Sequence, residues 1–185
     1  MYEQITNTAS FIRSKTDSTP DIGIILGTGL GGLAEQIEKE TVLEYGEIPG
    51  FPVSTVEGHK GRLIFGRLGG KAVVAMQGRF HYYEGYTQQQ VTFPVRVMKL
   101  LGVRYLFGSN ASGGVNPGFR RGDLMVITDH INLTPNPLIG PNLEQFGERF
   151  PNMAHAYDPE LVGLATRSAE ALGLGLRYGC YVGLT

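Results

Sequence analysis

Two spacings of apolar residues divide the chain into expected helices and strands. Helical spacing predicts helices over 2–15, 33–37, 87–101 and 158–172. Short apolar runs, most of them bounded by glycine or proline, predict strands over 21–26, 41–45, 62–68, 71–77, 103–108, 124–129 and 178–184. Strands that alternate with helices are typical of α/β domains. We therefore expect an α/β fold with a single domain, residues 1–185, and a central mixed, largely parallel β-sheet flanked by helices.

Local signals set the ends of several segments. Thr87 and Gln90 have the spacing of a capping box at the start of a helix. Pro94 lies inside that helix and is expected to kink it or to delay its start. The glycine pair at 69–70 separates two expected strands and predicts a hairpin. Residues 132–157 show no period, and a stretch of this length without regular structure is usually functional.

Composition and charge exclude several classes of protein. The 185 residues are 42% apolar and 18% charged, which rules out a highly charged disordered chain. A net charge of −1 gives little support for nucleic acid or an anionic membrane as partner. Cys180 is the single cysteine, so an intramolecular disulfide and a cysteine-based metal site are excluded. With no expected signal peptide or membrane span, we expect a cytoplasmic protein.

The first candidate site is the glycine turn at 27–32, directly after the strand at 21–26. Its glycines fit G-x-G-x-x-G, and such a turn exposes backbone N–H groups that attract an anion. Thr28 adds a hydroxyl donor. Glu44, at the end of the next strand, is placed to bind the ribose of a dinucleotide. Phosphate binding, dinucleotide binding and a plain tight turn remain open at this point.

The second candidate site is the segment 77–86, which follows the strand at 71–77. Arg79 offers a planar fork for two phosphate oxygens, and His81 can add a further donor. Glu84 stands three residues after His81 and can hold its imidazole. Neighbouring tyrosines offer faces for a sugar or base. The alternative is a surface loop in which an Arg–Glu ion pair is merely structural.

Two histidines and a second glycine turn complete the candidates. Small residues at 108–114 follow the strand at 103–108 and let a ligand approach the backbone, although a tight turn explains them equally. His59 lies in a glycine-containing loop that suits a mobile lid or a merely solvated histidine. His130 ends a strand, where a hydrogen-bonded structural histidine is the better interpretation. The four histidines lack the spacing of a metal site, and G-x-S-x-G is absent.

Five motifs occur in a fixed order along the chain. They are GTGLGG at 27–32, GHKGR at 58–62, QGRFHYYEGY at 77–86, NASGG at 110–114 and DHIN at 129–132. In this order they resemble the trimeric purine nucleoside phosphorylases, and the resemblance extends from about residue 2 to the last residue. Each motif alone is modest, but five in order are highly specific.

The resemblance implies the reversible phosphorolysis of purine ribonucleosides and deoxyribonucleosides, such as inosine and guanosine, to free base and sugar 1-phosphate. His81 and Glu84 would be catalytic, with Glu84 orienting the ring. The phosphate-binding residues would be Thr28, His59, Arg79, Phe80, His81 and Ala111. The nucleoside-binding residues would be Tyr83, Asn110, Phe150 and Tyr181. Inorganic phosphate would be a co-substrate, with no metal or cofactor, in a homotrimer where Phe150 reaches the neighbouring subunit's site.

Departures from the family pattern keep alternatives open. Thr28 stands where many purine phosphorylases have serine, and Gly-Thr-Gly also resembles the methylthioadenosine phosphorylases. A dinucleotide-binding oxidoreductase and a non-catalytic nucleoside- or phosphate-binding module are the other hypotheses. The resemblance covers roughly the first two-thirds of such an enzyme and excludes its base-binding segments. Base preference is therefore open, and we expect these 185 residues alone to have little or no activity.

Overall fold

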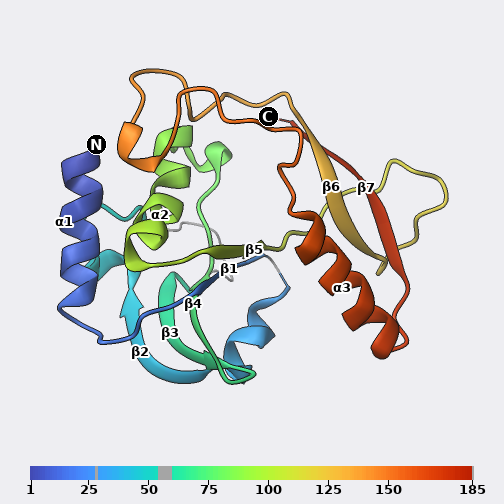
Figure 1. Ribbon diagram of the computed structural model, residues 1–185, viewed down its shortest axis with the longest axis horizontal. Coiled ribbons are helices and arrows are strands. Elements are labelled where there is room, and N and C mark those ends of the chain that lie inside the picture. Colours follow the sequence, from blue (N-terminus) through green and yellow to red (C-terminus); the bar gives the residue numbers. More distant parts are fainter. Residues whose placement is uncertain (28, 54–59, 185) are drawn as a thin grey trace. The chain divides into compact units, whose positions relative to one another are not determined.

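The computed structural model describes residues 1–27, 29–53 and 60–184 (Figure 1). The chain forms two compact units, Met1–Ala111 and Ser112–Thr185, and each is described by itself. Among the described residues, none of the helices combines the length and the hydrophobicity that a membrane span requires.

The first unit is built on a five-stranded mixed sheet in the order β2-β3-β4-β1-β5. Its strands are β1 (Ile22–Leu26), β2 (Glu38–Glu44), β3 (Arg62–Leu68), β4 (Lys71–Gln77) and β5 (Tyr105–Gly108). β1 pairs in parallel with β4 on one side and β5 on the other. β2, β3 and β4 form an antiparallel meander. The mixed sheet predicted from the sequence is thereby confirmed.

The hairpin between β3 and β4 turns at the predicted glycine pair. Leu68 pairs with Lys71, so Gly69 and Gly70 are the two central residues of the turn. Their φ angles are +55° and +74°, which L-residues with a side chain rarely adopt. A two-residue turn with two positive φ angles matches the twist of the flanking strands. The hairpin prediction is confirmed for this physical reason.

In the described part of this unit, two α-helices and three 3₁₀ helices accompany the sheet. They are α1 (Tyr2–Arg13), η1 (Gly31–Gln36), η2 (Tyr45–Glu47), η3 (Tyr82–Glu84) and α2 (Gln88–Leu101). α1 and α2 pack side by side (Figure 1). Thr87 and Gln90 form the predicted capping box, which satisfies backbone donors at the start of α2. The helix therefore begins at Gln88, and the later start considered for Pro94 is wrong.

Apolar side chains cover both faces of the central strands of this sheet. On one face, residues of β1, β3 and β4 form a cluster with Ala34 and Ile37, the residues in and after η1. On the other face, a Cβ added to Gly23 of β1 would lie 3.1 Å from the sulfur of Met98 in α2. β1 and β4 are thus covered on both sides, as expected for central strands of an α/β sheet, whereas β2 and β5 at the two edges are largely exposed. Burial on both faces holds the strand ends, and with them the loops, in a fixed register.

The described residues of the second unit form two parallel strands, one α-helix and a short 3₁₀ helix. β6 (Leu124–Asn132) and β7 (Leu176–Gly183) pair in parallel, and α3 (Pro159–Ala171) contacts β6. The Asp158 side chain accepts hydrogen bonds from the first backbone N–H groups of α3, which fixes its start. β6 continues three residues past its predicted end at 129, because pairing with β7 resumes after a register shift. Between β6 and α3, η4 (Glu144–Phe146) interrupts an otherwise irregular segment.

Candidate active site

The candidate site lies where three neighbouring parallel strands end. β4, β1 and β5 are adjacent and run in the same direction, so their carboxyl ends meet at one edge of the sheet. Gly27 follows β1, Arg79 follows β4 after one glycine, and Ser109 follows β5. Open α/β sheets bind ligands at this edge. The fold thus brings together both predicted glycine turns and the Arg79 segment.

Gly27 is the point where the two glycine turns touch. A Cβ at this position would lie 2.3 Å from the carbonyl oxygen of Ser109 and 2.7 Å from Nη1 of Arg79. Its backbone N–H donates to Oγ of Ser109 at 3.2 Å, and that hydroxyl donates to the carbonyl of Ile25 at 3.2 Å. Glycine is required here because backbone atoms of the neighbouring turn occupy the space that a side chain would fill.

The Arg79 side chain spans the gap between the ends of β4 and β5. Its Nη1 donates to the carbonyl oxygen of Ser109 at 2.7 Å, and its Nε donates to Nε2 of His81 at 3.1 Å. The guanidinium therefore stands directly beside the first glycine turn. A planar fork of donors in this position suits the recognition of an oxyanion.

Glu84 fixes the His81 ring, as the three-residue spacing predicted. One carboxylate oxygen accepts from both Nδ1 and the backbone N–H of His81, at 2.7 and 2.8 Å. The Glu84 side chain is 2% exposed, so this contact is shielded from water. Because arginine only donates and a carboxylate only accepts, the His81 ring here has its hydrogen on Nδ1 and its lone pair on Nε2. Nε2 is thus an acceptor, and in this structure its lone pair accepts the hydrogen bond from Nε of Arg79.

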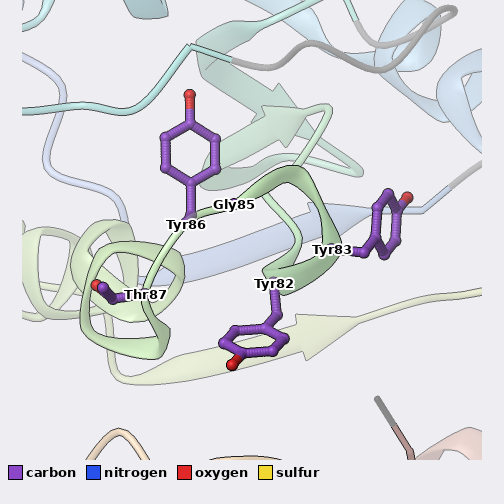
Figure 2. Close-up of a pocket in the computed structure, with 5 residues that line it drawn as sticks. All are labelled: Tyr82, Tyr83, Gly85, Tyr86 and Thr87. Atoms are coloured by element: carbon purple, nitrogen blue, oxygen red, sulfur yellow. The ribbon is translucent and has the colours of Figure 1, made fainter.

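Tyr83 stacks on the His81 ring, with the ring centroids 4.7 Å apart and the planes 15° from parallel. Tyr83 is 75% exposed, so its other face is open to a ligand. An open pocket of about 350 Å³ lies next to it, lined by Tyr82, Tyr83, Gly85, Tyr86 and Thr87. Figure 2 shows the three tyrosine rings projecting from this turn in different directions. The aromatic surface expected for a sugar or base is present.

Phe80 does not contribute its side chain to this polar cluster. Its ring is 3% exposed and packs against Tyr45 and Phe51, with centroids 5.1 and 6.4 Å away. The chain after β4 places successive side chains on opposite sides, so Arg79 reaches the site and Phe80 enters the core. A contact of Phe80 with phosphate stays a prediction, and its buried ring leaves only the backbone for that contact.

Other expected site residues lie at the end of the first unit or outside the described residues. Asn110 follows Ser109, and its Cα lies 2.8 Å from where a Cβ of Gly27 would stand. Ala111, the last residue of the unit, is exposed. Thr28 and His59 fall outside the described residues, so their roles stay predictions.

Two expected nucleoside contacts belong to the second unit. Phe150 is 83% exposed, with the Arg149 guanidinium 5.6 Å from its ring centroid. Tyr181 on β7 lies against His130, with ring centroids 5.0 Å apart. His130 Nδ1 also hydrogen-bonds the Tyr157 hydroxyl at 2.8 Å, which agrees with the structural role expected for it. Contacts of Phe150 and Tyr181 with a substrate stay predictions.

Sequence reasoning missed two residues that build the site. Ser109 supplies the carbonyl that accepts from Arg79, and its hydroxyl ties Gly27 to the second turn. Tyr45 donates its hydroxyl to the carbonyl of Gly78, the residue before Arg79, at 2.7 Å. The position of Ser109, a hydroxyl residue directly after a strand, was the available signal. No periodicity points to Tyr45, because its partner lies 33 residues along the chain.

The geometry does not support a dinucleotide site at the first glycine turn. Glu44 ends β2 at the edge of the sheet, and β3 and β4 stand between β2 and β1. The acidic residue of a dinucleotide fold belongs instead to a strand beside the first one. The turn also leads into the six-residue η1 and not into a long helix. Within the described residues, no group of three His, Cys, Asp or Glu side chains is arranged to hold a metal ion.

A family model, curated proteins and solved structures all show similarity of this chain to phosphorylases. The family model described as "Phosphorylase superfamily" matches residues 21–185. Purine nucleoside phosphorylase 1 of Bacillus subtilis is 55% identical over 186 residues, covering 100% of this chain and 69% of that protein. A Schistosoma purine nucleoside phosphorylase in complex with hypoxanthine superimposes with a TM-score of 0.93 at 46% identity, covering 98% of this chain and 66% of that one.

A further structure, a purine nucleoside phosphorylase in complex with ribose-1-phosphate, superimposes with a TM-score of 0.92 at 48% identity. It covers 97% of this chain and 68% of that chain. The chain thus spans about two thirds of the length of these three relatives.

Proposed function

The chain belongs to the phosphorylase superfamily and, within it, to the purine nucleoside phosphorylases, and on this basis we propose that it takes part in the reversible phosphorolysis of purine nucleosides. Inosine and guanosine are the proposed substrates, and a free purine and a sugar 1-phosphate the products. The observation that supports this most directly is the Arg79–His81–Glu84 cluster beside the first glycine turn. Hypoxanthine and ribose-1-phosphate, bound in two similar structures, are the two products expected from inosine.

The proposed reaction needs a fixed site for phosphate. A phosphate oxygen forms a bond to C1′ of the sugar while the C1′–N9 bond breaks. The electron pair of the C1′–N9 bond leaves with the purine, which takes up a proton. Positive charge develops on the sugar, and the phosphate dianion next to it is both nucleophile and stabilising charge. Donors that are already in place cost no reorganisation during the reaction. Holding phosphate against C1′ adds the advantage of proximity.

Arg79 and His81 are the proposed phosphate donors in the described part of the site. On binding, phosphate would take the guanidinium hydrogens that now reach Ser109 and His81. A second proton on the ring would let Nε2 of His81 donate to a phosphate oxygen while Nδ1 keeps its contact with Glu84. The backbone N–H of Ala111 and the hydroxyl of Thr28 are proposed as further donors, with His59 nearby.

The remaining proposals concern the nucleoside and the assembly. Tyr83, Asn110 and Tyr181 are proposed to contact the nucleoside. Phe150 is proposed to reach the site of a neighbouring subunit in a homotrimer. The open face of Tyr83 and the exposed ring of Phe150 support these roles. We also propose a cytoplasmic protein that uses inorganic phosphate as co-substrate and needs no organic cofactor.

Phosphate-dependent release of purine from inosine is the direct test. The polypeptide should be made from the intact reading frame and assayed with and without phosphate, with guanosine and methylthioadenosine as parallel substrates. We expect hypoxanthine and ribose 1-phosphate to appear in equal amounts only when phosphate is present. Inosine that stays intact while phosphate binds would instead favour a non-catalytic binding module.

A Glu84→Gln variant is expected to lower kcat by about tenfold, because the amide oxygen keeps the shape but loses the charge that holds His81. Steady-state kinetics at saturating phosphate measure this effect. Glu47→Gln, an acidic residue of η2 outside the cluster, is the matched control and should keep the parent rate. Equal rates for Glu84→Gln and the parent would contradict the orienting role.

A further inference from the structure

Tyr45 is a buried residue that the proposed mechanism does not use. It is 1% exposed, and its ring packs against Phe51 and Phe80 at centroid distances of 5.5 and 5.1 Å. Within this aromatic cluster its hydroxyl donates to the carbonyl oxygen of Gly78 at 2.7 Å. Burial raises the pKa of this hydroxyl well above its ordinary value, so the group stays protonated and remains a donor.

Tyr45 holds both chain neighbours of Arg79. On one side its hydroxyl binds the carbonyl of Gly78, whose φ of +110° turns the chain out of β4. On the other side its ring packs on that of Phe80. A single side chain therefore contacts the residues directly before and directly after Arg79.

The backbone around Tyr45 is itself tied to the end of β4. The Tyr45 N–H donates to the carbonyl of Gly61 at 2.8 Å, and the Gly61 N–H donates to the carbonyl of Gln77 at 3.0 Å. Gln77 is the last residue of β4 and is 5% exposed. Tyr45 is thus anchored to the strand whose end it shapes, which makes it a rigid support and not a loosely packed ring.

We propose that Tyr45 is a positioning residue for phosphate, acting through Arg79 and His81. The inference rests on the proposed function, because it concerns the same phosphate site. A guanidinium recognises two phosphate oxygens only within a narrow range of angles, so a small rotation of the 78–81 backbone weakens binding. Tyr45 supplies the contact that prevents this rotation.

Tyr45→Phe tests this role because it removes the hydroxyl and keeps the ring. We expect KM for phosphate to rise about tenfold, the size of effect that one buried hydrogen bond can have. The kcat at saturating phosphate and the KM for inosine should stay within about twofold of the parent values, since the other contacts of the site are unchanged. The dissociation constant of phosphate, measured by calorimetry, should rise by the same factor.

Thr8→Val is the matched control for the loss of a buried hydroxyl. Thr8 is also 1% exposed, and its hydroxyl donates to the carbonyl of Pro49 at 2.6 Å. Both variants should be less stable to urea, but Thr8→Val should leave the phosphate KM unchanged. If the phosphate KM rises equally in both variants, the cause is a general loss of stability of the first unit. That result would overturn the inference.

A double variant separates positioning from direct binding. If Tyr45 acts through Arg79, Tyr45→Phe should weaken phosphate binding far less in an Arg79→Ala background than in the parent. Full additivity of the two effects would contradict the inference. An unchanged phosphate KM in Tyr45→Phe, with a parent that binds phosphate, would refute the inference alone. A parent that binds no phosphate would refute the proposed function and the inference together.

Discussion

Replacing Arg79 with alanine is expected to lower kcat/KM for phosphate by about 30- to 1,000-fold, equivalent to about 2–4 kcal/mol of transition-state stabilisation. The reason is geometric as well as electrostatic. The guanidinium stands beside the first glycine turn and already reaches the end of β5 through the carbonyl of Ser109. Its loss removes a preorganised cation that water cannot replace without reorganisation.

Initial rates of purine release over a range of phosphate concentrations measure this effect, and Arg79→Lys refines it. Lysine keeps the charge but not the planar fork, so we expect an intermediate loss. Arg67→Ala is the matched control, because Arg67 on β3 forms an exposed ion pair with Glu40. A phosphate dependence that is the same in Arg79→Ala and the parent would refute the role of Arg79.

Local patterns predicted much of the framework that places Arg79. Short apolar runs followed by glycine identified β1, β4 and β5, and the three-residue spacing of His81 and Glu84 predicted their contact. These features depend on residues that are close in the sequence. Since parallel strands place their carboxyl ends at one edge, the location of the site followed from the strands alone.

Long-range contacts were not predictable in the same way. Ser109 accepts from Arg79 across 30 residues, and Tyr45 donates to Gly78 across 33 residues. The spacing of apolar residues does not predict such pairs, because each partner alone resembles an ordinary turn or core residue. The burial of the Phe80 ring was not predictable for a related reason. A polar motif suggested a ligand contact, whereas the aromatic cluster around Tyr45 draws that ring inward.

The resemblance drawn from five ordered motifs was more informative than any single motif, and the comparisons confirm it. The glycine turn at 27–32 shows why. Its G-x-G-x-x-G pattern fitted a dinucleotide site equally well, and only the strand order of the sheet separates Glu44 from β1. A glycine pattern indicates that the backbone comes close to a partner, which is either a ligand or another segment of the chain. At Gly27 the structure shows that this partner is another turn of the same chain.

Gly27→Ala is expected to produce the largest combined loss of stability and phosphate binding. The new methyl group would lie 2.3 Å from the Ser109 carbonyl oxygen and 2.8 Å from Cα of Asn110, both backbone atoms that cannot rotate away. Relief requires the ends of β1 and β5 to move apart, which costs about 1–3 kcal/mol of unfolding free energy. The same movement displaces Arg79, whose Nη1 would lie 2.7 Å from the added carbon.

Gly32→Ala is the informative control, because it changes another glycine of the same pattern. Among the described residues, and apart from the adjoining backbone, no heavy atom lies within 4 Å of a Cβ at Gly32, so alanine there should leave stability and the phosphate KM near the parent values. A dinucleotide fold predicts the opposite, since its third glycine permits close packing of helix and strand. Urea unfolding and phosphate titration of both variants decide between the two. Equal tolerance of alanine at 27 and 32 would contradict the close contact between the two glycine turns.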